Sequence, residues 1–330
     1  MKNRLKELKK LSKDALAKEM WSGNDQFADL FNALVYHRQQ LNPDELSDTN
    51  TDLSTLIADK EFAETIRKYR DVSKLSANGE CYQILAIENQ AAIHYAMPFR
   101  CLLYDVLSFM HQYKEIAAKN KKEGNIQGNE FLSGFTKKDR FINCRTIVFY
   151  YGDKKWDAAT KLSDLVEFQT VADRNAFNDY NMELICLNDL DVENCEFKDK
   201  KTRDFFLFTT SVLKNGFRNI PKELSDMDLE TAYIAASLTG TEAQLSKMLQ
   251  EQSDKGKETI DMCNAVMENL KEVHDKSYAA GEAKGEARGE ARGEAKMKKA
   301  ILSLHMNGMD IETISKMTGL PLDEVKAYVL

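Results

Sequence analysis

The chain has 330 residues, of which 43% are hydrophobic, which is enough apolar material for one large domain or for a domain with appendages. A net charge of −7 argues against a protein that coats nucleic acid through bulk positive charge, although a cleft enzyme needs only a local basic surface. The sequence contains no run near the roughly 20 apolar residues of a membrane span and no signal-peptide centre near its N-terminus. We therefore expect a cytoplasmic protein without membrane contact.

Two helices are predicted at the N-terminal end. Residues 2–20 carry leucines at helical spacing, which is typical of an amphipathic helix that packs on the body or on a second subunit. The next helix is predicted to begin near Asn24, with Asp25 in its first turn. A carboxylate at that position can simply complement the helix dipole, so the sequence alone leaves a structural role for Asp25 open. A polar, acidic loop is expected over residues 42–60.

A β-hairpin is the central feature of the sequence. The pair Asn78-Gly79 favours a tight type I′ turn, because that turn needs positive φ at both central residues. The predicted arms are Asp71–Leu75 and Cys81–Gln90.

The second arm ends in polar residues where an apolar strand would continue. Side chains alternate along a strand, so Glu88 and Gln90 share one face and Asn89 takes the other, while Asp71 lies on the adjacent arm within reach of Glu88. Two neighbouring carboxylates repel each other unless a cation neutralises them, and Mg²⁺ prefers carboxylate oxygens. The hairpin therefore predicts an acidic metal site.

A long helix that covers the sheet is predicted to start at Pro98, because apolar residues recur after it at helical spacing. Arg100 lies in its first turn, where the guanidinium could contact a scissile phosphate or only pair with a carboxylate. His94 lies just before it and is either a catalytic group or an ordinary loop residue.

The segment 119–139 is rich in Lys, Gly and Asn and predicts a mobile loop of the kind that grips substrate. Its basic residues are either a local nucleic-acid surface or a solvated face, and with their neighbours they are Lys114, Lys119, Lys121, Lys122, Lys137, Lys138 and Arg140. The apolar run 145–152 predicts a strand buried on both faces, and 181–188 predicts another strand.

The C-terminal third is predicted to be mainly helical. Residues 202–272 indicate a small helical cap, and the repeat GEAK-GEAR-GEAR-GEAK over 281–296 favours a hinge or tether, because each of its four glycines costs a helix about 1 kcal/mol. The tail 298–330 is typical of a helix-turn-helix. Its last helix begins with acidic residues, which favours packing against protein over reading DNA.

Several ordered motifs together resemble the Rpn family of recombination-promoting nucleases and transposases, in the PD-(D/E)XK superfamily. They are NDQFADLFN (24–32), RDV (70–72), IENQ (87–90), HYAMP (94–98), VFYYG (148–152) and WD (156–157). The resemblance covers roughly residues 18–250. It implies an α/β fold with a restriction-endonuclease-like αβββαβ core, a mixed central sheet flanked by helices, and a C-terminal helical extension. The expected divisions are a core over 1–200, a cap over 201–272, a tether over 273–297 and a helix-turn-helix-like tail over 298–330.

The resemblance implies a Mg²⁺-dependent DNA endonuclease acting in recombination, transposition or phage defence, with Mn²⁺ as a possible substitute metal. Asp71, Glu88 and the backbone carbonyl of Asn89 would hold the metal, with Asp25 as a further ligand and His94 and Arg100 as auxiliary groups. Gln90 stands where the superfamily usually has lysine. A neutral amide can orient water but supplies no positive charge.

Two alternatives follow from the same residues. The chain could be a DNA-binding or assembly protein on a degenerate nuclease core, which the acidic net charge and Gln90 both fit. The hairpin could also be purely structural, with Glu88 paired to Arg70 or Arg100. For the endonuclease and for the DNA-binding protein, the expected partners are DNA and a second copy of the chain. The dimer would form through helical segments.

Overall fold

The computed structural model describes residues 2–48, 72–77, 80–87, 93–152 and 154–329. The chain divides into two compact units, Met1–Met267 and Glu268–Leu330. The fold is mixed α/β and contains more helix than strand, so the predicted class is confirmed at that level. In the part of the chain that the structure describes, no helix is long and apolar enough to cross a membrane.

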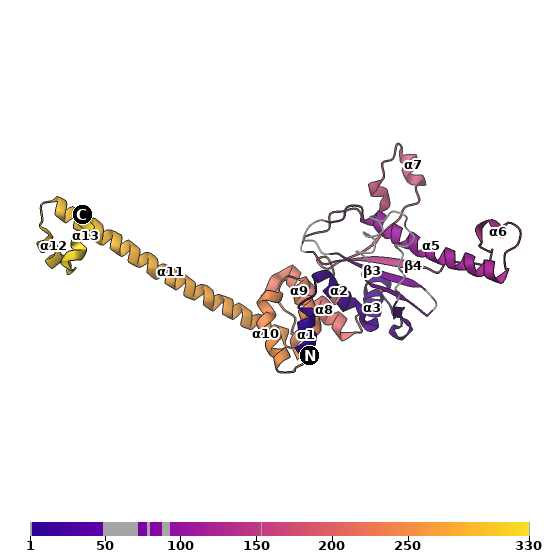
Figure 1. Cartoon of the computed structure of the whole chain (residues 1–330), viewed down its shortest axis with the longest axis horizontal. Coiled ribbons are helices and arrows are strands. Elements are labelled where there is room, and N and C mark those ends of the chain that lie inside the picture. The colour runs from indigo at the N-terminus through magenta and orange to yellow at the C-terminus, as the bar shows by residue number, and fades with distance from the viewer. Residues whose placement is uncertain (1, 49–71, 78–79, 88–92, 153, 330) are drawn as a thin grey trace. The chain divides into compact units, whose positions relative to one another are not determined.

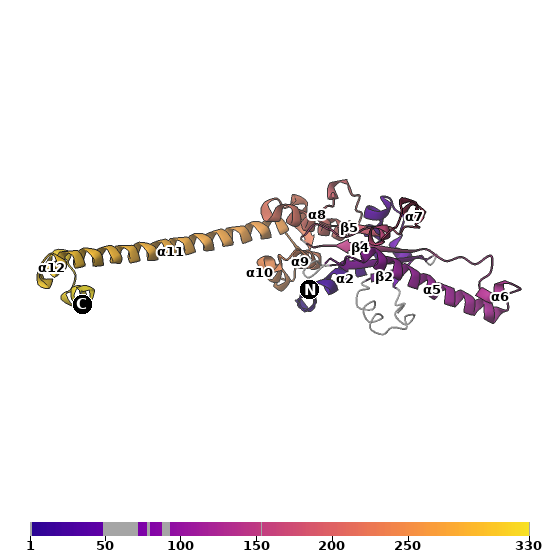
Figure 2. The same cartoon turned by 90° about the horizontal axis from the view of Figure 1, so that it is seen from above.

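The larger unit is built around a five-stranded sheet with the strand order β1-β2-β3-β4-β5 (Figures 1 and 2). The strands are β1 (Ser47–Asp48), β2 (Val72–Leu75), β3 (Cys81–Ile87), β4 (Cys144–Tyr150) and β5 (Glu183–Cys186). The first three are antiparallel neighbours, whereas β3, β4 and β5 run parallel. Parallel neighbours need a crossover connection, and the long helix α5 (Met97–Glu123) lies between β3 and β4 in the chain.

The predicted hairpin is confirmed as the antiparallel pair β2 and β3, with Leu75 opposite Cys81. Its connection is longer than a type I′ turn on Asn78-Gly79 requires. The Ser76 amide donates to the Glu80 carbonyl at 3.0 Å, and the Ser76 hydroxyl accepts from the Glu80 amide at 3.0 Å. Three residues therefore separate the closing pair instead of two, and Asn78 and Gly79 themselves lie outside the described residues.

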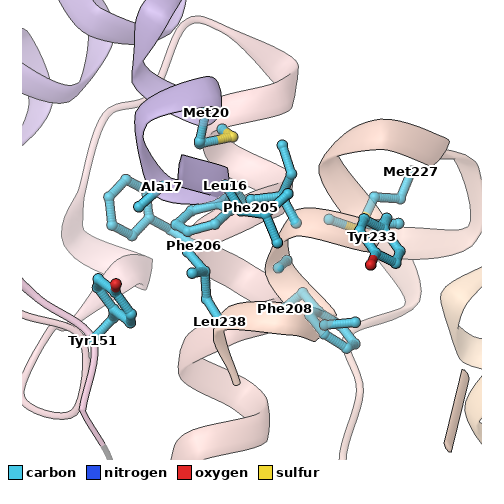
Figure 3. Packing of buried hydrophobic residues seen from close by; sticks show 14 of the residues in the cluster. Leu16, Ala17, Met20, Tyr151, Phe205, Phe206, Phe208, Met227, Tyr233 and Leu238 are labelled. Carbon is cyan, nitrogen blue, oxygen red and sulfur yellow. The ribbon is translucent and has the colours of Figure 1, made fainter. Parts of the chain in front are cut away.

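Strand β4 is buried on both faces, as its apolar run predicts. Ile147 and Phe149 belong to a large core with helices α2 (Lys13–Ser22) and α8 (Lys200–Asn215), and Val148 belongs to a second cluster with α5. The indole of Trp21 lies 5.2 Å from the Phe149 ring and 5.3 Å from the Phe205 ring between centroids. Figure 3 shows these helices meeting through their apolar side chains. Helices thus cover both faces of the sheet.

A buried lysine fixes β2 to the helical layer. Lys74 is only 1% exposed, and its ammonium donates to the Ser22 carbonyl at 2.7 Å and to the Asp48 carboxylate at 2.6 Å. The ammonium also lies 5.7 Å from the centroid of the Phe27 ring. An ion that is withdrawn from water requires such partners, so Lys74 holds β1, β2 and the end of α2 in one arrangement.

Some helices of the larger unit pack on this sheet, and others pack on neighbouring helices. Together they are α1 (Lys2–Leu8), α2 (Lys13–Ser22), α3 (Asn24–Phe31), α5, α6 (Glu130–Ser133), α7 (Val171–Ala176), α8 (Lys200–Asn215), α9 (Leu229–Leu238) and α10 (Glu242–Asp254). A two-stranded sheet joins β6 (Met227–Asp228) to β7 (Thr259–Ile260). Residues of α8 and α9 belong to the same core as α2 and β4, so the segment predicted as a cap is part of the main body.

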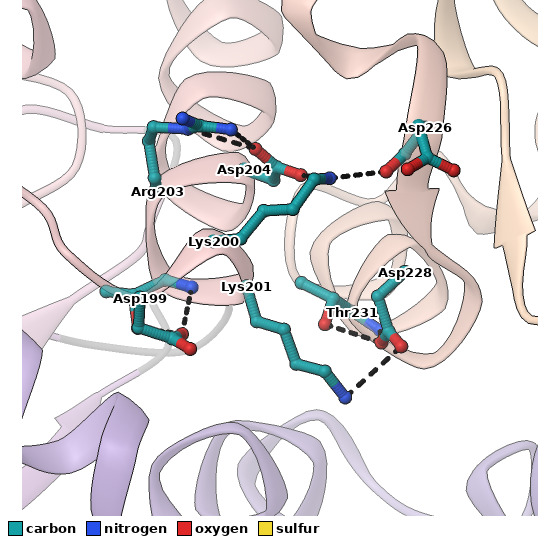
Figure 4. Close-up of polar contacts among 9 residues, drawn as sticks. Asp199, Lys200, Lys201, Arg203, Asp204, Asp226, Asp228 and Thr231 are labelled. Carbon is teal, nitrogen blue, oxygen red and sulfur yellow. Dashed lines mark hydrogen bonds and ion pairs between the residues drawn. The ribbon is translucent and has the colours of Figure 1, made fainter.

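Helix caps and ion pairs join α8 to α9 (Figure 4). Asp199 caps α8 by accepting from the Thr202 amide at 2.8 Å, and Asp228 caps α9 by accepting from the Thr231 amide at 2.9 Å. Lys201 of α8 reaches the Asp228 carboxylate at 3.2 Å. Each cap satisfies an amide that the first helical turn leaves without a partner, and the ion pair links the two helix starts.

Helix α11 (Met262–Met306) begins in the larger unit and runs without interruption through residues 281–296 of the second unit. The predicted tether is therefore helical. Ala, Glu, Lys and Arg are strong helix formers and occupy three of every four repeat positions, which offsets the glycine cost. The tail that was predicted as a helix-turn-helix contains two helices, α12 (Ile311–Thr318) and α13 (Leu322–Val329). These helices pack on the end of α11 through a small separate core of Ile301, Ile314 and Val325.

The segment 119–139, predicted as a mobile loop, is an ordered extension of α5. The helix continues to Glu123, α6 follows, and the chain folds back along α5 toward β4 (Figures 1 and 2). We call residues 109–142 the arm. The Asn120 side-chain amide donates to the Gly134 carbonyl at 3.1 Å, so a polar side chain of the helix holds the returning segment in place.

Candidate active site

The described strands lead directly to the predicted acids. Strand β2 begins one residue after Asp71, and β3 ends at Ile87, one residue before Glu88. Asp71, Glu88, Asn89 and Gln90 themselves lie outside the described residues. Their geometry therefore stays a prediction, while the strand ends that adjoin them are defined.

His94 and Arg100 lie together at the start of α5. The His94 carbonyl accepts from the Met97 amide at 3.0 Å, and this contact places the histidine just before the helix. Arg100 stacks on the buried Tyr104, with 5.8 Å between its guanidinium carbon and the ring centroid. Partial burial and then the positive charge of Arg100 lower the pKa of His94 below 6.5. His94 is therefore a neutral imidazole beside a fixed cation at pH 7.

The loops after β4 and β5 complete the described part of this sheet edge. The Asn188 side chain donates to the Gly152 carbonyl at 2.7 Å, and the Tyr150 hydroxyl donates to the Lys154 carbonyl at 2.9 Å. Ile87 pairs with Tyr150, so these loops leave the sheet at the end where Glu88 follows β3. In parallel sheets, ligands bind outside this carboxyl end of the strands.

One acidic residue at this edge was not predicted as a site residue. The Tyr95 hydroxyl lies 3.5 Å from the Asp157 carboxylate, which brings an exposed acid next to the His94 segment. The sequence contained the signal, because Trp156-Asp157 is part of the motif set. Without the fold, nothing connected that motif to His94.

Asp25 lies at a different place from His94 and Arg100. It is exposed in the first turn of α3, at a pocket of about 260 Å³ that it shares with Asp29, Lys198 and Asp199 and that contains neither His94 nor Arg100. Asp29 accepts from the Lys198 and Asp199 amides at 2.9 and 3.1 Å. Burial raises the pKa of Asp29, and the two amides partly oppose that shift. The pocket thus joins α3 to the start of α8.

The candidate metal ligands can be assessed by their chemistry. Among the described residues, no group of three His, Cys, Asp or Glu side chains is arranged to hold a metal ion. The predicted set of Asp71, Glu88 and the Asn89 carbonyl consists entirely of oxygen donors. Such a set suits a hard cation such as Mg²⁺ better than zinc, which favours nitrogen and sulfur.

The predicted basic surface is gathered on the arm. Lys119, Lys137 and Lys138 line a hollow of about 640 Å³ together with acidic and amide side chains. Lys114, Lys121, Lys122 and Arg140 are exposed on the same extension. The structure thus brings together cations from α5 and from the returning segment.

Comparisons with protein-family models, with curated proteins and with solved structures find no match to this chain.

Proposed function

We propose that this chain is a metal-dependent DNA endonuclease with a restriction-endonuclease-like core, as its resemblance to the Rpn family implies. The observation that carries the proposal is the order of the described elements. Three antiparallel strands are followed by a long helix and by a strand parallel to the third, with the predicted acids adjoining β2 and β3. This is the order expected for an αβββαβ core. A cytoplasmic location and a homodimer through helical segments belong to the same proposal.

In the proposed mechanism Asp71, Glu88 and the Asn89 carbonyl would hold Mg²⁺. Bound Mg²⁺ would polarise the scissile phosphate and lower the pKa of a water molecule. The Gln90 amide would orient that water through a hydrogen bond. Arg100 would provide the positive charge that the superfamily lysine usually supplies.

His94 supports this assignment of roles. Its lowered pKa keeps the imidazole neutral at pH 7, so it is able to accept a proton that Gln90 cannot take. Arg100 beside it carries a permanent charge. The two functions of one lysine would then be divided between two residues at the start of α5.

The test is nicking of supercoiled plasmid in Mg²⁺ and in Mn²⁺. Asp71→Asn and Glu88→Gln keep the side-chain shape but remove the charge, so we expect each to slow nicking at least about 100-fold. Glu251→Gln, at an exposed position on α10, is the matched control and should cleave like the unaltered chain.

Circular dichroism and a thermal melt of each variant establish that the fold is retained. Full activity in Glu88→Gln would overturn the assignment of the acids. DNA binding without cleavage in either metal would identify the alternative, a binding protein on a degenerate core.

A further inference from the structure

The arm combines a stable fold with an exposed apolar tip. Phe131 and Leu132 of α6 are 76% and 96% exposed, at the end of the extension farthest from the sheet (Figures 1 and 2). Two adjacent large apolar side chains at an apex are unusual on a surface that has no partner. Contacts at several points hold the segment around them, and this arrangement keeps both side chains at the surface.

The anchors lie along the returning segment. The Gln112 side chain makes two hydrogen bonds with the Ile142 backbone, at 2.7 and 2.9 Å, and the Tyr113 hydroxyl donates to the Ser133 carbonyl at 2.5 Å. The Phe135 ring lies 5.1 Å from the Phe141 ring between centroids. The arm is thus an ordered projection that presents its tip in a fixed place.

The arm also differs in charge from the rest of the chain. Residues 119–140 contain six basic and three acidic residues, a surplus of three positive charges in a chain whose net charge is −7. Among the described residues, none of these six cations forms an ion pair. Their side chains are all exposed.

The three acids within residues 119–140 accept hydrogen bonds from groups of the arm itself. Asp139 accepts from the Asn120 amide and from the Thr136 backbone amide, both at 2.7 Å. Glu130 accepts from the Lys137 backbone amide at 3.3 Å, and Glu123 accepts from the Asn125 side chain at 2.8 Å. The basic side chains of this segment are exposed, so they are able to meet an external anion.

We propose that the arm is a second contact to duplex DNA, in which the lysines neutralise phosphates and Phe131 and Leu132 pack into a groove. Phosphate neutralisation by lysine is the main source of affinity for DNA, and apolar side chains enter grooves between base steps. This proposal rests on the proposed nuclease function, because it places the arm on the same duplex as the cleavage site.

The length of α5 sets the position of this contact. Lys119 lies 19 residues beyond Arg100 on one continuous helix, which corresponds to roughly 28 Å at 1.5 Å per residue. One base pair of duplex occupies about 3.4 Å. On a duplex that runs along α5 with the cleaved bond near Arg100, the arm would contact the backbone about eight base pairs, or nearly one turn, away from that bond.

The test measures binding of a 30-base-pair duplex by fluorescence anisotropy at several salt concentrations in EDTA, so that no cleavage occurs. The arm variant carries Lys121→Gln, Lys122→Gln, Lys137→Gln and Lys138→Gln. The control carries the same charge change at exposed lysines elsewhere, as Lys10→Gln, Lys222→Gln, Lys255→Gln and Lys257→Gln. Melting curves confirm that both variants fold.

We expect the arm variant to bind about 100-fold more weakly near 150 mM salt and to lower the slope of log affinity against log salt by about 3 to 4. The control should change both quantities much less. Phe131→Ser with Leu132→Ser should weaken binding and leave the salt slope unchanged, because no charge is removed.

Equal losses in the two lysine variants would overturn the proposal, as would unchanged affinity in the arm variant. If the protein binds phosphatidylserine vesicles through Phe131 and Leu132 and does not bind DNA, the arm would be reassigned to a lipid surface. Sedimentation that shows a dimer lost in the tip variant, with DNA affinity unchanged, would reassign it to self-association. Plasmid nicking by Glu88→Gln reports separately on the nuclease.

Discussion

Arg100 and Gln90 are the residues on which the proposed chemistry depends most. If Arg100 supplies the charge that Gln90 lacks, Arg100→Gln should slow nicking by roughly 100-fold. Gln90→Lys restores a cation at the usual position, so Arg100→Gln in that background should cost about tenfold or less. Initial nicking rates of the four proteins at saturating Mg²⁺ give this comparison. Equal losses in both backgrounds would show that Arg100 acts independently of position 90.

Asp105 joins α5 to the sheet through a buried carboxylate. It accepts from the Thr146 hydroxyl at 2.7 Å and from the Tyr180 hydroxyl at 2.6 Å. Burial raises the pKa of Asp105 above 3.8, although these hydrogen bonds oppose the shift. Above pH 3.8 the unfolded chain loses this proton while the folded chain retains it, so the free energy of unfolding falls as pH rises toward the folded pKa.

Asp105→Asn should remove this part of the pH dependence. Like the protonated acid, the amide has one oxygen that accepts and one group that donates, so one hydroxyl keeps its bond and the other turns to accept. We therefore expect stability within about 1 kcal/mol of the unaltered chain near pH 4. The variant should become relatively more stable toward pH 7. Urea unfolding from pH 4 to 7 measures the difference, and a difference that stays constant with pH would contradict the assignment. Asp105→Ala should be destabilised at every pH.

At this scale the sequence indicates candidate site residues but not their neighbours. His94 and Arg100 were singled out by their places around Pro98, and the structure brings them together. The contact between Tyr95 and Asp157 spans 62 positions in the chain, so no local pattern could predict it. Asp105 interrupts an apolar stretch, and nothing in its own helix indicates Tyr180 as its partner.

Among the elements, the arm owes its order to a close approach at Gly134. This residue has φ +70°, and a Cβ added there would lie 2.9 Å from the Ala117 Cβ. Gly134→Ala should loosen the arm, because it adds both backbone strain and a clash with α5. Gly128→Ala is a matched control in the same arm, since Gly128 has φ +52° and open space around it.

Hydrogen exchange of the arm amides separates the two effects. Strain from positive φ costs roughly 1 to 2 kcal/mol in either variant. Gly134→Ala should lower protection of the arm further than Gly128→Ala, and the excess reports the contact with Ala117. Identical protection in the two variants would mean that the returning segment does not depend on this approach.

Elements with a strong local signal were predictable, whereas those fixed by distant contacts were not. The apolar run of β4 and the Asn-Gly signal identified the strand and the hairpin. The arm has the composition of a loop and is ordered by Gln112 and Asn120, which bond to residues 14 to 30 positions away. The glycines of the repeat in α11 predict a break, whereas the strong helix formers between them are sufficient for a continuous helix.

Over the whole molecule, the described hydrophobic residues form separate cores in the two compact units. Ile301, Ile314 and Val325 make a small cluster that shares no residue with the clusters of the larger unit. A core this small buries little apolar surface, so the free energy of unfolding of these helices is small. Ile314→Ala removes a side chain that is 0% exposed and should cost about 2 to 5 kcal/mol, enough to unfold the tail helices.

The expected result is local unfolding of the second unit. Hydrogen exchange should lose protection over α12 and α13, while amides of β4 and α8 stay protected and plasmid nicking is retained. Met317→Ala, at a 65% exposed position of α12, is the control and should leave the tail intact. Loss of protection throughout the chain after Ile314→Ala would show that the two cores unfold together.

The division into units was only partly predictable. Capping signals such as Asp310 marked the tail helices, and Asp310 accepts from the Thr313 amide at 2.9 Å. The sequence predicts a separate cap after residue 200, because an apolar helix face does not indicate which other element it packs on. Contacts of Phe205 and Phe206 with Trp21, nearly 200 residues earlier, join them to the body.

The burial of Lys74 has a consequence for chemical labelling. An amine-acylating reagent modifies exposed lysines such as Lys121 quickly, but it reaches the Lys74 amine only after the contacts with Ser22 and Asp48 separate. The modification rate at Lys74, divided by that at Lys121 in the same sample, therefore measures how often the β1 edge of the sheet opens. Mass spectrometry of one labelled digest would therefore report opening of the sheet at a position three residues from Asp71.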